Sequence, residues 1–341
     1  EDNMKFDVII GNPPYQLSTD GFGGQAKPIY HLFVEQAKKL NPNYLVMITP
    51  ARWFAGGMGL NEFRSTMLAD KRLKFIADFH QSEDCFQGVE IKGGVCYFLW
   101  DSSYSGLCQV RTIVNREVID EGFRDVQAHD ILIRFNKAVQ ILEKVKKISE
   151  IFCDSFAYGL NSFGLPTNFL NFEKTPSKNN LKLYVRGGTK EIKREKVTQG
   201  TDLFDKYKVL LSKAYNAGDS YPHQIIGIPI VAQPNSCCTM TYFVTAAFDD
   251  SNQANNYASY LSTKFCRFMI SIRKNTQDIN KEKLSFVPIQ DFNEPWTDEK
   301  LYAKYGLSLD EIAFIESMIR PMDLAVVAND AINDAVEVDD E

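Results

Sequence analysis

Apolar residues alternate between strand-like runs and helix-like spacing over the first hundred positions. Residues 6–10, 44–49, 73–79 and 95–100 are short apolar runs typical of buried strands. A set of apolar residues at helical spacing follows the first run: Ile29, Leu32, Phe33, Ala37 and Leu40. Residues 61–69 repeat this helical pattern. Strands that alternate with helices indicate a parallel or mixed sheet with helices on its faces.

The pattern changes after residue 112. A helix is predicted over 131–150, and short strands over 207–212 and 225–232 lie in a polar region rich in Gly, Asn and Pro. The apolar spacing of 251–272 indicates another helical stretch. Helices at 297–305 and from Ser308 to Arg320 end the ordered pattern, and Ser308 with Glu311 predicts a capping box.

These elements predict an α/β protein in three parts. Residues 1–112 form a partial Rossmann-like sheet, residues 113–290 a mixed α+β domain, and residues 291–341 a helical segment with an acidic tail.

Composition narrows the classes of protein. The 341 residues are 44% hydrophobic and 24% charged, as in ordinary globular proteins. No apolar run reaches the roughly 18–20 residues of a membrane span, and Glu1-Asp2-Asn3 does not open a signal peptide. Seven cysteines without CxxC spacing predict neither a disulfide framework nor a zinc site, so we expect no metal and a cytoplasmic location.

Charge is distributed unevenly along the chain. Residues 291–341 hold 14 acidic and 3 basic residues, whereas Lys182–Lys213 holds nine basic and four acidic ones. A basic segment in an acidic chain points to contact with nucleic acid. A solvated surface with a polar tail accounts for the same charges.

Asn12-Pro13-Pro14-Tyr15 stands where the first strand ends, which is where open α/β sheets bind ligands. The Asn12 side-chain oxygen and the Pro13 carbonyl can each accept one N–H of an exocyclic amine. The prolines restrict the backbone of the turn. Tyr15 offers a flat face on which a base can stack. The four residues therefore suit the binding of an amino-bearing base.

"VIIGNPPYQ" resembles the catalytic motif of amino-directed methyltransferases. Later segments resemble the gamma-type adenine-specific DNA methyltransferases that belong to type IIG-like restriction-modification proteins. Those of the sheet are "AKPIYHLFVEQAKKL", "YLVMITPARWF", "LKFIADF" and "VEIKGGVCYFLW"; those beyond it are "YGLNSFGLPTNF", "STKFCRFMISIRKNTQDI" and "YGLSLDEIAFIESMIRPMD". The resemblance implies that 1–112 is the C-terminal half of a catalytic domain and 113–290 a target-recognition domain.

The resemblance also implies a mechanism on double-stranded DNA with S-adenosylmethionine as methyl donor. The target adenine is flipped out of the duplex, Asn12 and Pro13 hold its amino group, and Tyr15 stacks on its ring. Phe98 is the candidate for the second face of the base, with Tyr97 as the alternative. A place in the sheet core explains Phe98 equally well, because the register of its strand is open.

The cofactor motif of such enzymes is expected upstream of Glu1, so we expect a C-terminal fragment that is inactive without the cofactor-binding half.

The glycine loop after residue 50, with Arg52, Trp53 and Phe54, is interpreted as a loop beside the base pocket. "VEIK", from Glu90 to Lys92, resembles half of a nuclease metal site, but Asp84 fits poorly as its partner, and whether a nuclease is attached stays open.

The recognition region supplies the candidate contacts to DNA. They are a basic cluster, a residue pair after a predicted strand, and a second basic patch: Lys190, Lys193, Arg194 and Lys196; Lys213 and Tyr215; Arg267, Arg273 and Lys274. For any one of them alone, a solvated surface charge is the favoured explanation, and the prediction of DNA contact is made for the set.

Two other functions are compatible with the sequence. One is a DNA-recognition module without activity of its own. The other is a methyltransferase that acts on a protein glutamine or on RNA, where the same four-residue motif serves.

Overall fold

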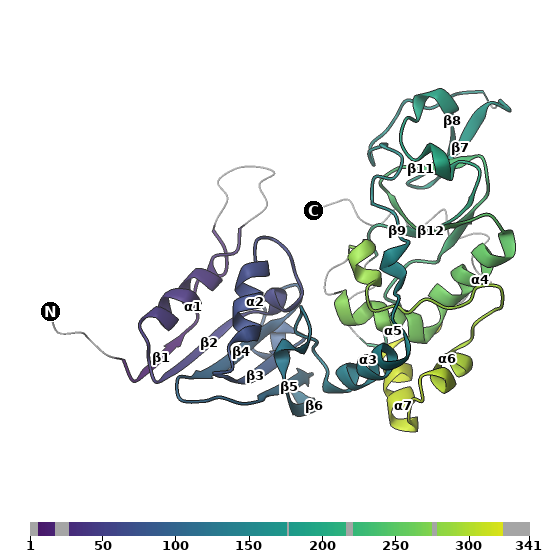
Figure 1. Ribbon diagram of the computed structural model, residues 1–341. Coiled ribbons are helices and arrows are strands. Elements are labelled where there is room, and N and C mark those ends of the chain that lie inside the picture. Colours follow the sequence, from purple (N-terminus) through teal and green to yellow (C-terminus); the bar gives the residue numbers. More distant parts are fainter. Residues whose placement is uncertain (1–5, 18–26, 176, 216–220, 275–277, 323–341) are drawn as a thin grey trace. The chain divides into compact units, whose positions relative to one another are not determined.

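A computed structural model describes residues 6–17, 27–175, 177–215, 221–274 and 278–322 (Figure 1). The chain forms two compact units, Glu1–Gln140 and Ile141–Glu341, and each is described by itself. Among the helices described, none combines the length and the apolar character that crossing a membrane requires.

Unit 1 is built on a six-stranded sheet with the strand order β1-β2-β4-β3-β5-β6. The strands are β1 Val8–Gly11, β2 Tyr44–Pro50, β3 Leu73–Phe79, β4 Val95–Asp101, β5 Cys108–Val114 and β6 Glu117–Arg124. β1 pairs with β2 and β3 with β5 in parallel, while the other neighbours are antiparallel. The predicted mixed sheet is confirmed, and β1 lies at its edge.

Helices α1 (Tyr30–Lys39) and α2 (Asn61–Ala69) share one core with the sheet (Figure 1). Strand side chains alternate between the two faces, so the residues of β2 and β4 that enter this core are every second one. They include Leu45, Met47, Phe98 and Trp100. Tyr97 and Leu99 point to the opposite face and are partly exposed.

Strands β5 and β6 place residues beyond 112 in unit 1. The sequence puts the start of the recognition domain at residue 113, whereas the compact unit extends to Gln140. The physical reason is long-range: β5 pairs in parallel with β3, and β6 completes a hairpin with β5. Most side chains of β6 are exposed or partly exposed, so its apolar pattern is weak. Helix α3 (Asn136–Ile148) spans the division.

Unit 2 contains two three-stranded sheets, β10-β9-β12 and β11-β7-β8. The strands are β7 Asn180–Val185, β8 Gly188–Lys193, β9 Tyr207–Ser212, β10 Ile230–Ala232, β11 Ser236–Cys238 and β12 Tyr242–Phe248. The helices are α4 Ser251–Ser262, α5 Lys264–Arg273, α6 Asp298–Lys304 and α7 Leu309–Met318. Its mixed α+β character agrees with the prediction.

Local capping explains where the helices of unit 2 begin. The helical stretch predicted over 251–272 is two helices, because the Thr263 side chain accepts a hydrogen bond from the Cys266 amide and starts α5. The capping box predicted before α7 is confirmed: Ser308 Oγ accepts from the Glu311 amide, and the Glu311 carboxylate accepts from the Ser308 amide at 2.7 Å.

Candidate active site

The Asn-Pro-Pro-Tyr segment leaves the carboxyl end of β1 and is fastened on its far side. The Tyr15 carbonyl accepts from the Ile29 amide at 3.1 Å, and the Leu17 amide donates to the Lys27 carbonyl at 3.1 Å. Gln16 and Pro28 form an antiparallel bridge between these bonds. The turn is therefore held at both ends, by the sheet and by the residues that lead into α1.

Burial alternates along the turn. Pro13 is buried, whereas Asn12 and Pro14 are exposed. The buried ring of Pro13 fixes the backbone of the turn, since proline also restricts its own φ and the conformation of the preceding residue. The Asn12 amide is consequently presented to solvent from a rigid support.

Tyr15 packs on the core with one edge. Its ring meets Tyr30 edge-on, with the centroids 6.5 Å apart and the planes at 81°. Tyr30 in turn contacts Phe63, which contacts Trp53. Burial raises the pKa of Tyr15 to about 12, and Cys96 and Cys85 add to this effect. Tyr15 is therefore a neutral, flat surface over an aromatic cluster, of which the sequence placed Trp53 beside the pocket but did not assign Tyr30 or Phe63 to the site.

The structure brings neither candidate for the second stacking ring to Tyr15. Phe98 is 0% exposed and lies in the core beneath α1 and α2, which argues against a role in base stacking. Tyr97 points to the other face of the sheet, where its ring contacts Phe75 and Phe79 at 5.8 and 5.9 Å. The strand register, which the sequence left open, decides both placements.

A buried polar row crosses the sheet at the edge where the turn lies. In the strand register, Thr49 of β2 lies opposite Cys96 of β4, and Cys96 lies opposite Asp78 of β3. Asp78 is 0% exposed and lies 3.4 Å from His80 Nε2 and 3.3 Å from Arg134 Nη2. Burial raises the pKa of Asp78 to about 6, against the opposing effect of Arg134. In the sequence, Asp78 is the single acidic residue of the apolar segment "LKFIADF", and it is the one feature that could have indicated this row.

The glycine loop after β2 does not fit an S-adenosylmethionine site. A buried guanidinium occupies it: Arg64 donates to the Gly56 carbonyl at 2.8 Å and to Asn61 Oδ1 at 3.1 Å. A side chain at Gly56 would meet the Arg52 carbonyl at 2.5 Å, so this glycine serves close packing. Trp53 and Phe54 are buried core residues.

The "VEIK" segment lies in the loop before β4 and not on a strand. Within the ranges that the structure describes, no group of three or more His, Cys, Asp and Glu side chains could hold a metal ion.

The basic cluster of unit 2 divides into paired and unpaired cations. Arg194 forms an ion pair with Asp205 at 2.9 Å, and Lys196 forms one with Glu173 at 2.6 Å. Lys190 and Lys193 are exposed on β8. Lys193 pairs with Asn180 through its backbone, but its side chain has no hydrogen bond or ion pair among the described residues. Only part of the cluster is therefore available to phosphates.

The second basic patch is mostly interior. Arg267 is 1% exposed and donates to backbone carbonyls, including that of Arg320 at 2.8 Å. Arg273 is 6% exposed and lies over the Phe286 ring, with its Nε 3.5 Å from Glu282. These placements argue against Arg267 and Arg273 as DNA contacts, because a guanidinium enclosed by protein cannot meet a phosphate.

Three candidates remain: Lys213, Tyr215 and Lys274. Lys274 Nζ donates to the Tyr215 carbonyl at 3.1 Å, which ties α5 to the segment after β9. Lys213 precedes Tyr215 by two residues, and both side chains are partly exposed. Their role in DNA binding stays a prediction.

Residues 1–86 match the sequence profile of the Eco57I restriction-modification methylase family. The resemblance to restriction-modification methylases is thereby confirmed for this region. A 125-residue segment is also 47% identical to an uncharacterized adenine-specific methylase of Mycoplasma pneumoniae. That segment is 35% of this chain and 28% of the relative, so the chain spans under a third of the relative it matches.

Solved structures give weaker likenesses. The type IIG restriction endonuclease BpuSI matches with a TM-score of 0.38 and 11% identity, over 91% of this chain and 48% of that one. The methyltransferase subunit of a type I restriction-modification system from Streptococcus thermophilus matches with a TM-score of 0.26 and 16% identity, over 44% of this chain and 34% of that one.

Proposed function

We propose that this chain carries the target-adenine site of an adenine-specific DNA methyltransferase. The observation that carries the proposal is the rigid Asn-Pro-Pro-Tyr turn at the carboxyl end of β1, with Asn12 exposed and Tyr15 beside it. The match of residues 1–86 to restriction-modification methylases and the relative described as an adenine-specific methylase support it.

In this proposal, Asn12 and the turn bind the exocyclic amine of a flipped adenine. The Asn12 side-chain oxygen and the Pro13 carbonyl accept its two N–H groups. Holding both hydrogens bends the nitrogen away from the ring plane and makes its lone pair available as a nucleophile. Tyr15 contributes stacking and no charge, since its raised pKa keeps the phenol protonated.

The methyl donor of such enzymes is S-adenosylmethionine, and we assign no residue of this chain to it. Unit 2 is proposed to bind the surrounding duplex, with Lys190 and Lys193 as candidate contacts. The seven free cysteines suit a reducing compartment, which supports a cytoplasmic location.

The proposal is tested by binding to a base that has no pairing partner, because such a base costs less energy to flip. Duplexes with an adenine opposite an abasic site are compared with duplexes that carry hypoxanthine there, because hypoxanthine has the same ring system and lacks the amine. We expect the protein to prefer adenine by about tenfold, since each of two hydrogen bonds contributes roughly 0.5–1.5 kcal/mol.

Asn12→Ala supplies the matched control. Because Asn12 is exposed, this variant is expected to fold and to bind the duplex as before, yet to lose most of the preference for adenine. Equal binding of adenine and hypoxanthine by the unsubstituted protein contradicts the proposal and leaves a recognition module without a base site.

A further inference from the structure

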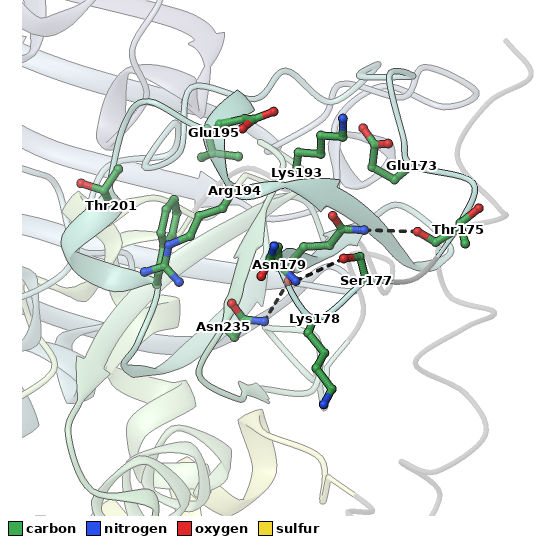
Figure 2. Close-up of a pocket in the computed structure, with 13 residues that line it drawn as sticks. Glu173, Thr175, Ser177, Lys178, Asn179, Lys193, Arg194, Glu195, Thr201 and Asn235 are labelled. Carbon is green, nitrogen blue, oxygen red and sulfur yellow. Dashed lines mark hydrogen bonds between the residues drawn. The ribbon is translucent and has the colours of Figure 1, made fainter.

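Unit 2 contains a polar hollow of about 880 Å³ (Figure 2). Its walls come from the loop before β7, the end of β8 with the residues after it, and the turn between β10 and β11. The volume lies within the roughly 300–1,000 Å³ of typical ligand sites. The charged and amide side chains that line it are Glu173, Lys178, Asn179, Asn180, Lys193, Arg194, Glu195 and Asn235.

Two of the amides build the wall. Asn180 is 6% exposed and its Nδ2 donates to the Thr175 carbonyl at 3.3 Å, while Asn235 Nδ2 donates to the Asn180 carbonyl at 2.8 Å (Figure 2). The backbone amide of Asn235 also donates to the Phe204 carbonyl, at 2.7 Å. These bonds join three loops that are far apart in the sequence, so the hollow has a fixed shape.

Arg194 is also part of the wall. Its guanidinium lies 4.8 Å from the centre of the Phe204 ring and is paired with the exposed carboxylate of Asp205. Glu173 is likewise neutralised by Lys196 at 2.6 Å.

Lys178 and Lys193 remain as exposed cations on opposite sides of the hollow (Figure 2). Neither side chain forms an ion pair or a hydrogen bond with another described residue, although the charge of Lys193 helps to lower the pKa of Glu173. The exposed amide Asn179 lies between them. Two separated cations suit a chain of phosphates better than a single small anion, and an asparagine amide can pair with the edge of a base.

We propose that this hollow binds a strand of duplex DNA, with Lys178 and Lys193 on phosphates and Asn179 on a base edge. The inference rests on the proposed function and narrows its recognition surface. It assigns affinity to two lysines and sequence preference to one amide.

The test measures how the dissociation constant for duplex DNA depends on salt. Each phosphate contact contributes about 0.9 to the slope of log K against log salt, so Lys178→Ala/Lys193→Ala should lower the slope by about 2. Lys39→Ala/Lys281→Ala removes the same charge at exposed positions outside the hollow and should leave the slope unchanged. If the alanine variant does not fold, Lys178→Gln/Lys193→Gln replaces it.

Asn179→Ala separates base reading from phosphate binding. Selection of bound sequences from random duplexes should show a relaxed preference at one position, with the salt slope unchanged. An unchanged slope in the double lysine variant overturns the proposal. Tighter binding to RNA of the same sequence, dependent on the two lysines, overturns it as well.

The two proposals fail separately. If the slope falls as expected but adenine and hypoxanthine bind equally, the hollow binds DNA and the adenine site is wrong. If adenine is preferred while the slope is unchanged, the adenine site stands and the hollow does not bind DNA.

Discussion

Asn12 and Tyr15 belong to one motif but lie in different environments. Asn12 is exposed and supported by a buried proline, whereas Tyr15 is half-buried against Tyr30. The Tyr15 hydroxyl is buried and has no hydrogen-bond partner in the part of the chain that the structure describes. An unsatisfied buried hydroxyl is unfavourable, so this group contributes nothing to stability.

Substitution of Tyr15 tests this directly. Tyr15→Phe keeps the ring and removes the unpartnered hydroxyl, so the free energy of unfolding should stay the same or rise by up to about 1 kcal/mol. Tyr15→Ala should weaken binding of unpaired adenine and hypoxanthine alike, by about 1–3 kcal/mol, because both lose the stacking surface. Urea denaturation and duplex binding measure the two effects. A Tyr15→Phe variant that loses more than about 2 kcal/mol would show that the hydroxyl has a partner.

At the level of elements, Asp70 joins helices α1 and α2 to the sheet of unit 1. It follows α2 and accepts from Lys38 of α1 at 2.6 Å, from Arg72 at 2.7 Å and from the Trp100 indole of β4 at 2.9 Å. Burial alone would raise the pKa of Asp70, but the hydrogen bonds from Arg72, Lys38 and Trp100 outweigh it and hold the pKa well below its usual range.

Asp70→Asn should lower the free energy of unfolding by about 2 kcal/mol at neutral pH. The asparagine has no negative charge, and its NH2 group would face the N–H donors of Lys38, Arg72 and Trp100. A carboxylate whose pKa is lowered by folding stabilises the protein above the unfolded value of roughly 3.9 and loses that effect as the pH falls through the folded value. The difference between the two proteins should therefore shrink below about pH 4. Urea denaturation from pH 7 to 3 measures it.

Glu121→Gln is the matched control for Asp70. It also removes a carboxylate bound to an arginine, Arg111 at 2.8 Å, but this pair is about one-third exposed. Exposed pairs contribute little, so the loss should be clearly smaller than that of Asp70→Asn. Equal losses in the two variants would mean that burial of Asp70 does not matter.

At the scale of the whole molecule, the two units have separate cores. That of unit 1 gathers α1, α2 and strands β2 to β5 of the sheet, while one in unit 2 includes Leu183, Ile192 and Val244. A unit with its own core of this size has what independent folding requires.

A chain of residues 136–341, which contains all of α3, should therefore fold alone. Its urea unfolding, followed by circular dichroism, should be one cooperative transition. Leu183→Ala in the same chain should lower the free energy of unfolding by about 3 kcal/mol, because Leu183 is 0% exposed. A broad transition that does not respond to Leu183→Ala would mean that unit 2 needs the rest of the protein.

Local sequence determined much of this protein. The alternation of strands and helices in the first hundred residues, the Asn-Pro-Pro-Tyr turn after the first strand and the capping box at Ser308 depend on neighbours within a few positions. Such features are written in spacing and residue type, so they could be predicted without coordinates.

Contacts between distant residues decided the rest. Phe98 and Tyr97 are adjacent aromatics, and only the cover of α1 and α2 on one face of the sheet buries the first and turns the second away. Arg194, Lys196 and Lys193 are equivalent in sequence, and only the positions of Asp205 and Glu173 leave Lys193 unpaired. The burial of a side chain and the pairing of a charge depend on which distant segments fold beside it, and no local pattern records that.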